Sequence, residues 1–120
     1  MPHFSLNYIK RGDPSVYDFT KEDFITDLQW HDLDLSNVVP EGTKLVRMKI
    51  KMVSSSLGGI SFREKGNINE INQATIKIQV SNIYYYEEFD VNCDSNRKIE
   101  YLASDVPWTV IDIIIRGWFK

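Results

Sequence analysis

The sequence predicts an all-β protein, an antiparallel β-sandwich of the jelly-roll kind preceded by an N-terminal arm or short helix. Apolar and polar residues alternate with a period of two in several short runs, which is typical of strands with one buried face. Residues that favour turns separate these runs at short spacing, as in sandwiches and barrels. The 120 residues are enough for one domain with its own core.

Residues 1–29 are expected to form the arm or extension, and residues 30–120 the sandwich domain. Thr20 followed by Asp23 three residues later is typical of a capped helical turn, so a short helix and an extended arm both remain open.

The sandwich is predicted to begin with a strand at 30–35, in which apolar and acidic residues alternate. The next strand, at 45–53, shows the clearest alternation. Its expected inward residues are Val46, Met48, Ile50 and Met52, and its expected outward residues are Arg47, Lys49 and Lys51.

The remaining strands follow the same logic. Alternation predicts strands at 74–80, 88–93 and 98–103, and "FREKGN" is expected to be a strand that enters a turn at Gly66-Asn67. The segment "CDSNRKIEY" is expected to be a hairpin, because Asp, Ser and Asn side chains favour turns. The last run, 108–118, is apolar on both faces around Asp112, as in a central or interface strand.

Composition argues against several classes of protein. The net charge of -3 and the scattered basic residues do not indicate the clustered basic surface that binds nucleic acid. No apolar run reaches the length of a signal peptide or a membrane span, and the single cysteine, Cys93, excludes an internal disulfide. We therefore expect a soluble protein made in a cytoplasm, without nucleic-acid or membrane partners and without a cofactor.

A metal site is not expected either. Oxygen ligands recur at alternate positions from Asp90 to Asn96, as at the start of a calcium loop. However, Ser95 stands where the sharp turn requires glycine, and Tyr101 where a bidentate glutamate should follow. Cys93 has no feature that would lower its pKa, and no catalytic motif occurs, so we expect no enzyme.

Two groups of residues are candidates for binding. The first is Tyr84, Tyr85 and Tyr86 with Asn67 and Asn69 of the Asn-rich loop, because aromatic faces stack on sugars and amides bond their hydroxyls. The second is an oligomer interface on the last strand, formed by Ile111, Ile113, Ile115, Trp118 and Phe119. The alternative for that strand is that the N-terminal segment covers its second face.

Four segments keep one order and spacing in this sequence: "WHDLDLSNVVPEGTKLVRMKI", "ISFREKGNINEIN", "NCDSNRKIEY" and "WTVIDIIIRGWF". Together they resemble a small β-sandwich domain of bacteriophage virion surface proteins, of the tail-fibre tip or capsid decoration type. The resemblance covers about three-quarters of the chain, from Trp30 to Phe119.

The resemblance implies a non-enzymatic structural protein at the virion surface that is assembled in the host cytoplasm. It also implies a homo-oligomer, with a trimer favoured, which contacts other virion proteins, with host surface glycans as further candidate partners. In such an oligomer the N-terminal segment is expected to lie as an arm on a neighbouring subunit. A carbohydrate- or receptor-binding module is the alternative function.

Overall fold

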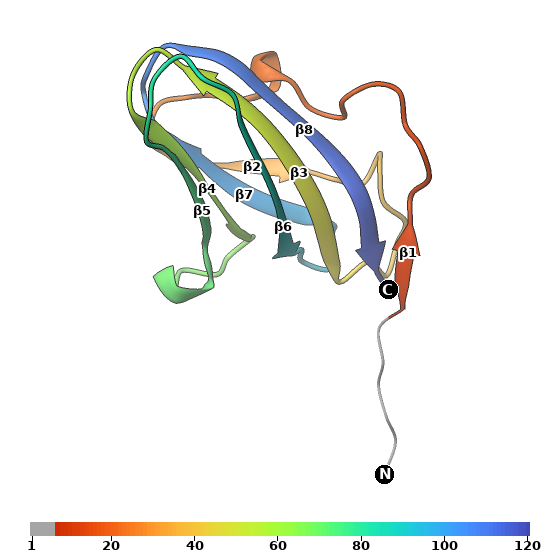
Figure 1. Ribbon diagram of the computed structural model, residues 1–120. Helices are drawn as coiled ribbons and strands as arrows, with labels where there is room; N and C mark the ends of the chain where they lie inside the picture. The colour runs from red at the N-terminus through yellow and green to blue at the C-terminus, as the bar shows by residue number, and fades with distance from the viewer. Residues whose placement is uncertain (1–6) are drawn as a thin grey trace.

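Two four-stranded antiparallel sheets pack face to face in the computed structural model, which describes residues 7–120 (Figure 1). In spatial order, the first sheet contains β1 (Tyr8–Lys10), β8 (Trp108–Phe119), β3 (Leu45–Ser54) and β6 (Tyr85–Asn92). The second contains β2 (Trp30–Asp34), β7 (Lys98–Ala103), β4 (Gly58–Glu64) and β5 (Ala74–Ile78). We call these the front sheet and the back sheet.

The strand pairing is a set of nested hairpins. β4 pairs with β5, β3 with β6, β2 with β7 and β1 with β8, so that the whole chain resembles one long hairpin rolled across two sheets. Two further pairings, β3 with β8 and β4 with β7, close each sheet. This is the connectivity of a jelly roll, and the predicted fold class is confirmed.

The core lies between the sheets, and β3 supplies its centre. Its four expected inward residues have no exposed surface. On the neighbouring strand β8, Ile111, Ile113 and Ile115 face the same interior opposite Met52, Ile50 and Met48. The back sheet contributes the other half of the core through Leu33, Ile60, Phe62, Ile76, Ile78, Ile99 and Tyr101.

A β-bulge interrupts β8 at Arg116. Arg47 of β3 lies opposite Gly117, and the next residue, Met48, lies opposite Ile115, so Arg116 is an extra residue without a partner. The bulge resets the alternation, so that Ile115 and Trp118 both face inward. This explains why the end of the last run does not alternate regularly in the sequence.

The described part of the N-terminal segment belongs to the sandwich of its own chain. β1 forms the edge of the front sheet, Phe19 forms an isolated bridge with Ile113, and Phe24 is part of the core. The expected helical turn is the 3-10 helix η1 (Lys21–Asp23), where the Asp23 carboxylate accepts a hydrogen bond from the Thr20 N–H. The described part of this segment therefore lies along the edge of β8 in its own chain, whereas the expected alternative was coverage of the second face of that strand.

Two of the expected turns are found, but one expected hairpin is not. Gly66 has a φ of 87° at the end of β4, before the 3-10 helix η2 (Glu70–Asn72). Residues 94–97 do form a tight turn, in which Arg97 N–H bonds the Asp94 carbonyl. However, β6 and β7 lie in different sheets, so this turn is a crossover between sheets and not a hairpin.

Candidate functional site

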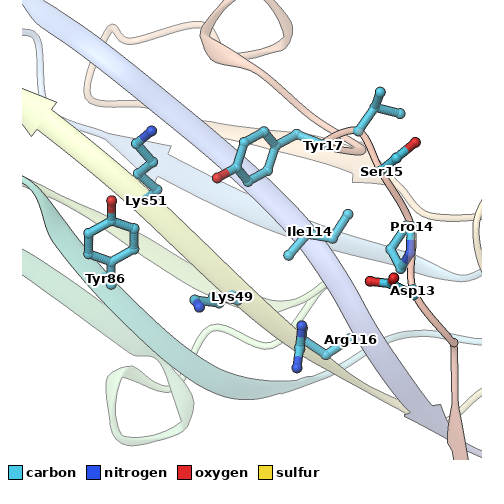
Figure 2. A pocket seen from close by; sticks show the side chains of 10 residues that line it. Asp13, Pro14, Ser15, Tyr17, Lys49, Lys51, Tyr86, Ile114 and Arg116 are labelled. Carbon is cyan, nitrogen blue, oxygen red and sulfur yellow. The ribbon is translucent and has the colours of Figure 1, made fainter.

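An open groove crosses the outer face of the front sheet, with a volume of about 310 Å³. One side is the loop of residues 13–17, and the other is formed by side chains of β3, β6 and β8 (Figure 2). Its lining residues are Asp13, Pro14, Ser15, Val16, Tyr17, Lys49, Lys51, Tyr86, Ile114 and Arg116.

The strands place three cations in this groove. Lys49 and Lys51 are two residues apart on β3, and therefore project from the same outer face. Arg116 is two residues after Ile114 on β8 and therefore projects from the same outer face into the groove. Ile114, which lies opposite Lys49, forms an apolar floor between these cations and the loop.

The loop wall is held in place at both ends. Arg11 N–H bonds the Arg116 carbonyl, and Asp18 N–H bonds the Ile113 carbonyl at 2.9 Å. Gly12, with a φ of 107°, turns the chain away from β8 between these two anchors. The Arg11 guanidinium also forms an ion pair with the Asp18 carboxylate across the base of the loop. The arginine of the sequence "RGD" is therefore engaged inside the fold.

Lys49 and Lys51 have no carboxylate within ion-pair distance in residues 7–120, a property that they share with other strand lysines such as Lys77 and Lys98. Arg47 is paired with Asp90 at 2.9 Å and Arg63 with Glu100 at 3.0 Å. Arg116 faces Glu88 at 3.7 Å, but both side chains are about half exposed, so this contact is weak.

Aromatic rings take the place of carboxylates beside these lysines. The Lys49 ammonium is 5.8 Å from the centre of the Tyr86 ring, and the Lys51 ammonium is 4.9 Å from that of Tyr84. The two tyrosine rings lie 6.3 Å apart on the outer face. The groove therefore combines unpaired positive charge, aromatic surface and hydroxyl groups within one chain.

The predicted sugar-binding residues are divided between several places. Tyr84 and Tyr86 lie on the outer face, whereas the Tyr85 hydroxyl accepts hydrogen bonds from the Gln79 and Val80 N–H groups inside the β5–β6 turn. Asn67 lines a small hollow with Asn92, at the other end of β6 from the tyrosines. Seven residues of strand separate these ends, a distance of about 23 Å. Asn69 lies in the same loop as Asn67, so the structure does not unite the predicted patch.

The predicted interface residues lie in intramolecular contacts. Ile111, Ile113 and Ile115 have no exposed surface, because they fill the space between the two sheets. Trp118 packs against the core, and Phe119 lies beside the Tyr8 ring at 5.1 Å. The prediction of an intersubunit surface is therefore wrong for the three isoleucines, which belong to the core of their own chain.

Cys93 and the Asp94 carboxylate both form contacts that belong to the fold. Burial raises the pKa of the Cys93 thiol from its ordinary value of 9.0 to about 11, and the thiol donates to the Thr43 carbonyl at 3.2 Å. The Asp94 carboxylate accepts hydrogen bonds from the Asn96 and Lys98 N–H groups, which satisfies it within the turn. Within residues 7–120, no group of three or more His, Cys, Asp or Glu side chains is placed to hold a metal ion.

Sequence reasoning missed the groove itself. The alternation at 45–53 identified Lys49 and Lys51 as outward residues, but outward lysines are common on any sheet. The missing information was the position of residues 13–17, which pack beside β8 although about 100 residues separate them in the chain.

Comparisons with known proteins add little to this description. The chain matches no protein-family model and no curated protein. Among solved structures it is similar to the coat protein of Tobacco streak virus, with 15% sequence identity and a TM-score of 0.39; the match covers 96% of this chain and 82% of that chain. The fold assignment rests on the strand pairing of this chain.

None of the helices in the described part of the chain has the length and apolar character needed to cross a bilayer.

Proposed function

We propose that this protein is a non-enzymatic structural subunit of a virion, a decoration or fibre subunit at the surface of a bacteriophage capsid or tail. Its role would be to oligomerise, with a trimer favoured, and to contact other virion proteins. The jelly roll is an architecture that viral capsid domains use, and lectin domains use it as well. Because one fold serves many functions, the proposal needs support from the surface of this chain.

The observation that carries the proposal is an apolar patch at one end of the sandwich, which we call the tip patch. It consists of four exposed side chains on two neighbouring loops: Leu57, Val80, Ile83 and Tyr84. The loops lie against each other, because Asn82 N–H bonds the Ser54 carbonyl at 2.8 Å. Clustered exposed apolar side chains of this kind are typical of protein–protein contact sites.

Light scattering after size exclusion tests this proposal. We expect the wild-type protein to form a stable oligomer, and the double variant Leu57→Ser, Ile83→Ser to dissociate, because polar side chains remove the apolar contact. Both residues are exposed, so the variant should remain folded.

The matched control is Ile71→Ser, which changes an isoleucine that is 92% exposed near the opposite end of β4. We expect this variant to keep the oligomeric state of the wild type. A wild-type protein that stays at the mass of one chain, 14.0 kDa, at every concentration would contradict self-assembly. An oligomer that survives the double variant would contradict the tip patch.

A second candidate function, a carbohydrate- or receptor-binding module, is favoured by the groove and not by the predicted tyrosine and asparagine patch. The next subsection develops this candidate.

A further inference from the structure

We propose that the groove on the front sheet binds an acidic sugar, a saccharide with one carboxylate, and that Lys49 and Lys51 bind the carboxylate. This deepens the second candidate function and is independent of oligomerisation, because one chain supplies all the lining residues.

The two lysines are the first argument. Neither ammonium group has an ion-pair partner among residues 7–120, whereas the two arginines on the same outer face, Arg47 and Arg116, lie 2.9 and 3.7 Å from a carboxylate. Two neighbouring like charges repel each other, and an anion placed between them relieves that repulsion. Charge-assisted hydrogen bonds to a carboxylate are also the strongest that a lysine forms.

The rest of the lining favours a sugar over a simple anion. Tyr86 offers part of a ring face, and Tyr17 extends from the loop with its hydroxyl group toward the strands. The Asp13 carboxylate accepts hydrogen bonds only, which suits the hydroxyl groups of a saccharide. A volume of about 310 Å³ is at the lower end of the range for small-molecule sites, and is compatible with one or two sugar rings.

The surrounding negative charge restricts the ligand to a low charge. Asp13 lines the groove, Glu88 lies opposite Lys49, and Asp112 lies opposite Lys51. Together with the net charge of -3, these carboxylates disfavour polyphosphates, nucleic acids and heavily sulfated chains. A saccharide with a single carboxylate fits both the unpaired lysines and their acidic surroundings.

Binding of 3′-sialyllactose, measured by titration calorimetry and by NMR shift changes, tests this inference. Lactose is the matched probe without the carboxylate, and acetate is the carboxylate without the sugar. We expect a dissociation constant on the order of 1 mM for 3′-sialyllactose, with about 10-fold weaker binding of both other probes. The shifted amides should belong to residues 13–17 and to β3.

The variant Lys49→Gln, Lys51→Gln should weaken the binding of 3′-sialyllactose by about 10-fold or more. Lys77→Gln is the control, because it removes an exposed lysine from the back sheet. All three lysines are on the surface of strands, and circular dichroism would verify that each variant is folded.

Equal affinity for 3′-sialyllactose and lactose would overturn the inference, as would equal affinity for 3′-sialyllactose and acetate. Unchanged affinity in the Lys49→Gln, Lys51→Gln variant would also overturn it. So would the absence of binding at a concentration of 3′-sialyllactose that is 10-fold above the expected dissociation constant. The Leu57→Ser, Ile83→Ser variant separates the two proposals, because loss of the oligomer should leave sugar binding intact.

Discussion

The carboxylate of Asp18 accepts a hydrogen bond of 2.8 Å from the main-chain N–H of Ile115, 97 residues later in the chain. The same carboxylate is paired with Arg11, and its side chain is 7% exposed. β1 is only three residues long and covers only the end of β8. Asp18 therefore provides a hydrogen-bond acceptor for a main-chain N–H at the edge of β8, beyond the part that β1 pairs with. It also anchors the loop that forms the wall of the groove.

Asp18→Ala should lower the free energy of unfolding by about 2–3 kcal/mol, because it leaves the Ile115 N–H and the Arg11 guanidinium without their acceptor. Urea unfolding followed by tryptophan fluorescence would measure this change. Asp13→Ala is the control, because Asp13 is exposed on the same loop, and it should change the free energy by less than about 0.5 kcal/mol. Equal effects of the two substitutions would contradict the role of Asp18.

Gly117→Ala should weaken the attachment of β1. A Cβ atom at Gly117 would lie 2.6 Å from the Ile9 carbonyl oxygen and would also overlap the Tyr8 ring, so β1 must shift. We expect a loss of about 1–3 kcal/mol in unfolding free energy and faster exchange of the Ile9 amide with solvent.

The double variant Tyr8→Ala, Gly117→Ala tests the cause of that loss. Removal of the tyrosine relieves its overlap with the new methyl group, but the contact with the Ile9 carbonyl remains. Relative to Tyr8→Ala alone, the second substitution should therefore still be destabilising, but by less than in the wild-type background. A fully additive pair would show that the ring does not contact position 117.

The two inward-facing tryptophans of β8 differ in their hydrogen bonds. The Trp108 indole N–H donates to the Ser104 carbonyl at 2.9 Å, whereas the buried indole N–H of Trp118 has no acceptor among residues 7–120. Trp→Phe removes similar volume at both positions. We therefore expect Trp108→Phe to be more destabilising than Trp118→Phe by about 1–2 kcal/mol, as measured by urea unfolding. The opposite order would show that Trp118 has a partner in solution.

Cys93 should be protected from thiol reagents in the folded protein. At pH 8 a pKa of about 11 instead of 9.0 lowers the thiolate fraction roughly 100-fold, and burial restricts access further. Reaction with Ellman's reagent should therefore be at least about 100-fold slower in buffer than in concentrated urea. Comparable rates in the two solvents would show that Cys93 is accessible.

The same shift predicts a dependence of stability on pH. Because the pKa of Cys93 is higher in the folded chain, its contribution to the free energy of unfolding is complete below pH 9 and declines as the pH rises toward 11. Cys93→Ala should lack this decline, so the stability difference between wild type and variant should change in that range. A difference that is constant across the range would contradict the raised pKa.

Much of the fold could be predicted from the sequence because alternation reports which side chains a strand buries. The inward residues of β3 were predicted correctly, and the strand predicted at 74–80 is found as far as Ile78, where β5 ends and Val80 is exposed. The turn at Gly66 was also predicted, because glycine readily adopts the positive φ that the structure shows there. Local patterns of this kind depend only on neighbouring residues, which the sequence specifies directly.

Alternation along the sequence is enough to predict an antiparallel β-sandwich, the positions of most of its strands and the faces that they bury. The three-dimensional structure is needed to establish which strands are partners, that the turn at 94–97 crosses between sheets, and that Ile111, Ile113 and Ile115 are core. It also decided that residues 13–17 lie beside Lys49 and Lys51 and so create the groove. The physical reason is that a period of two specifies the two faces of a strand, whereas its neighbours depend on hydrogen bonds between residues far apart in the chain.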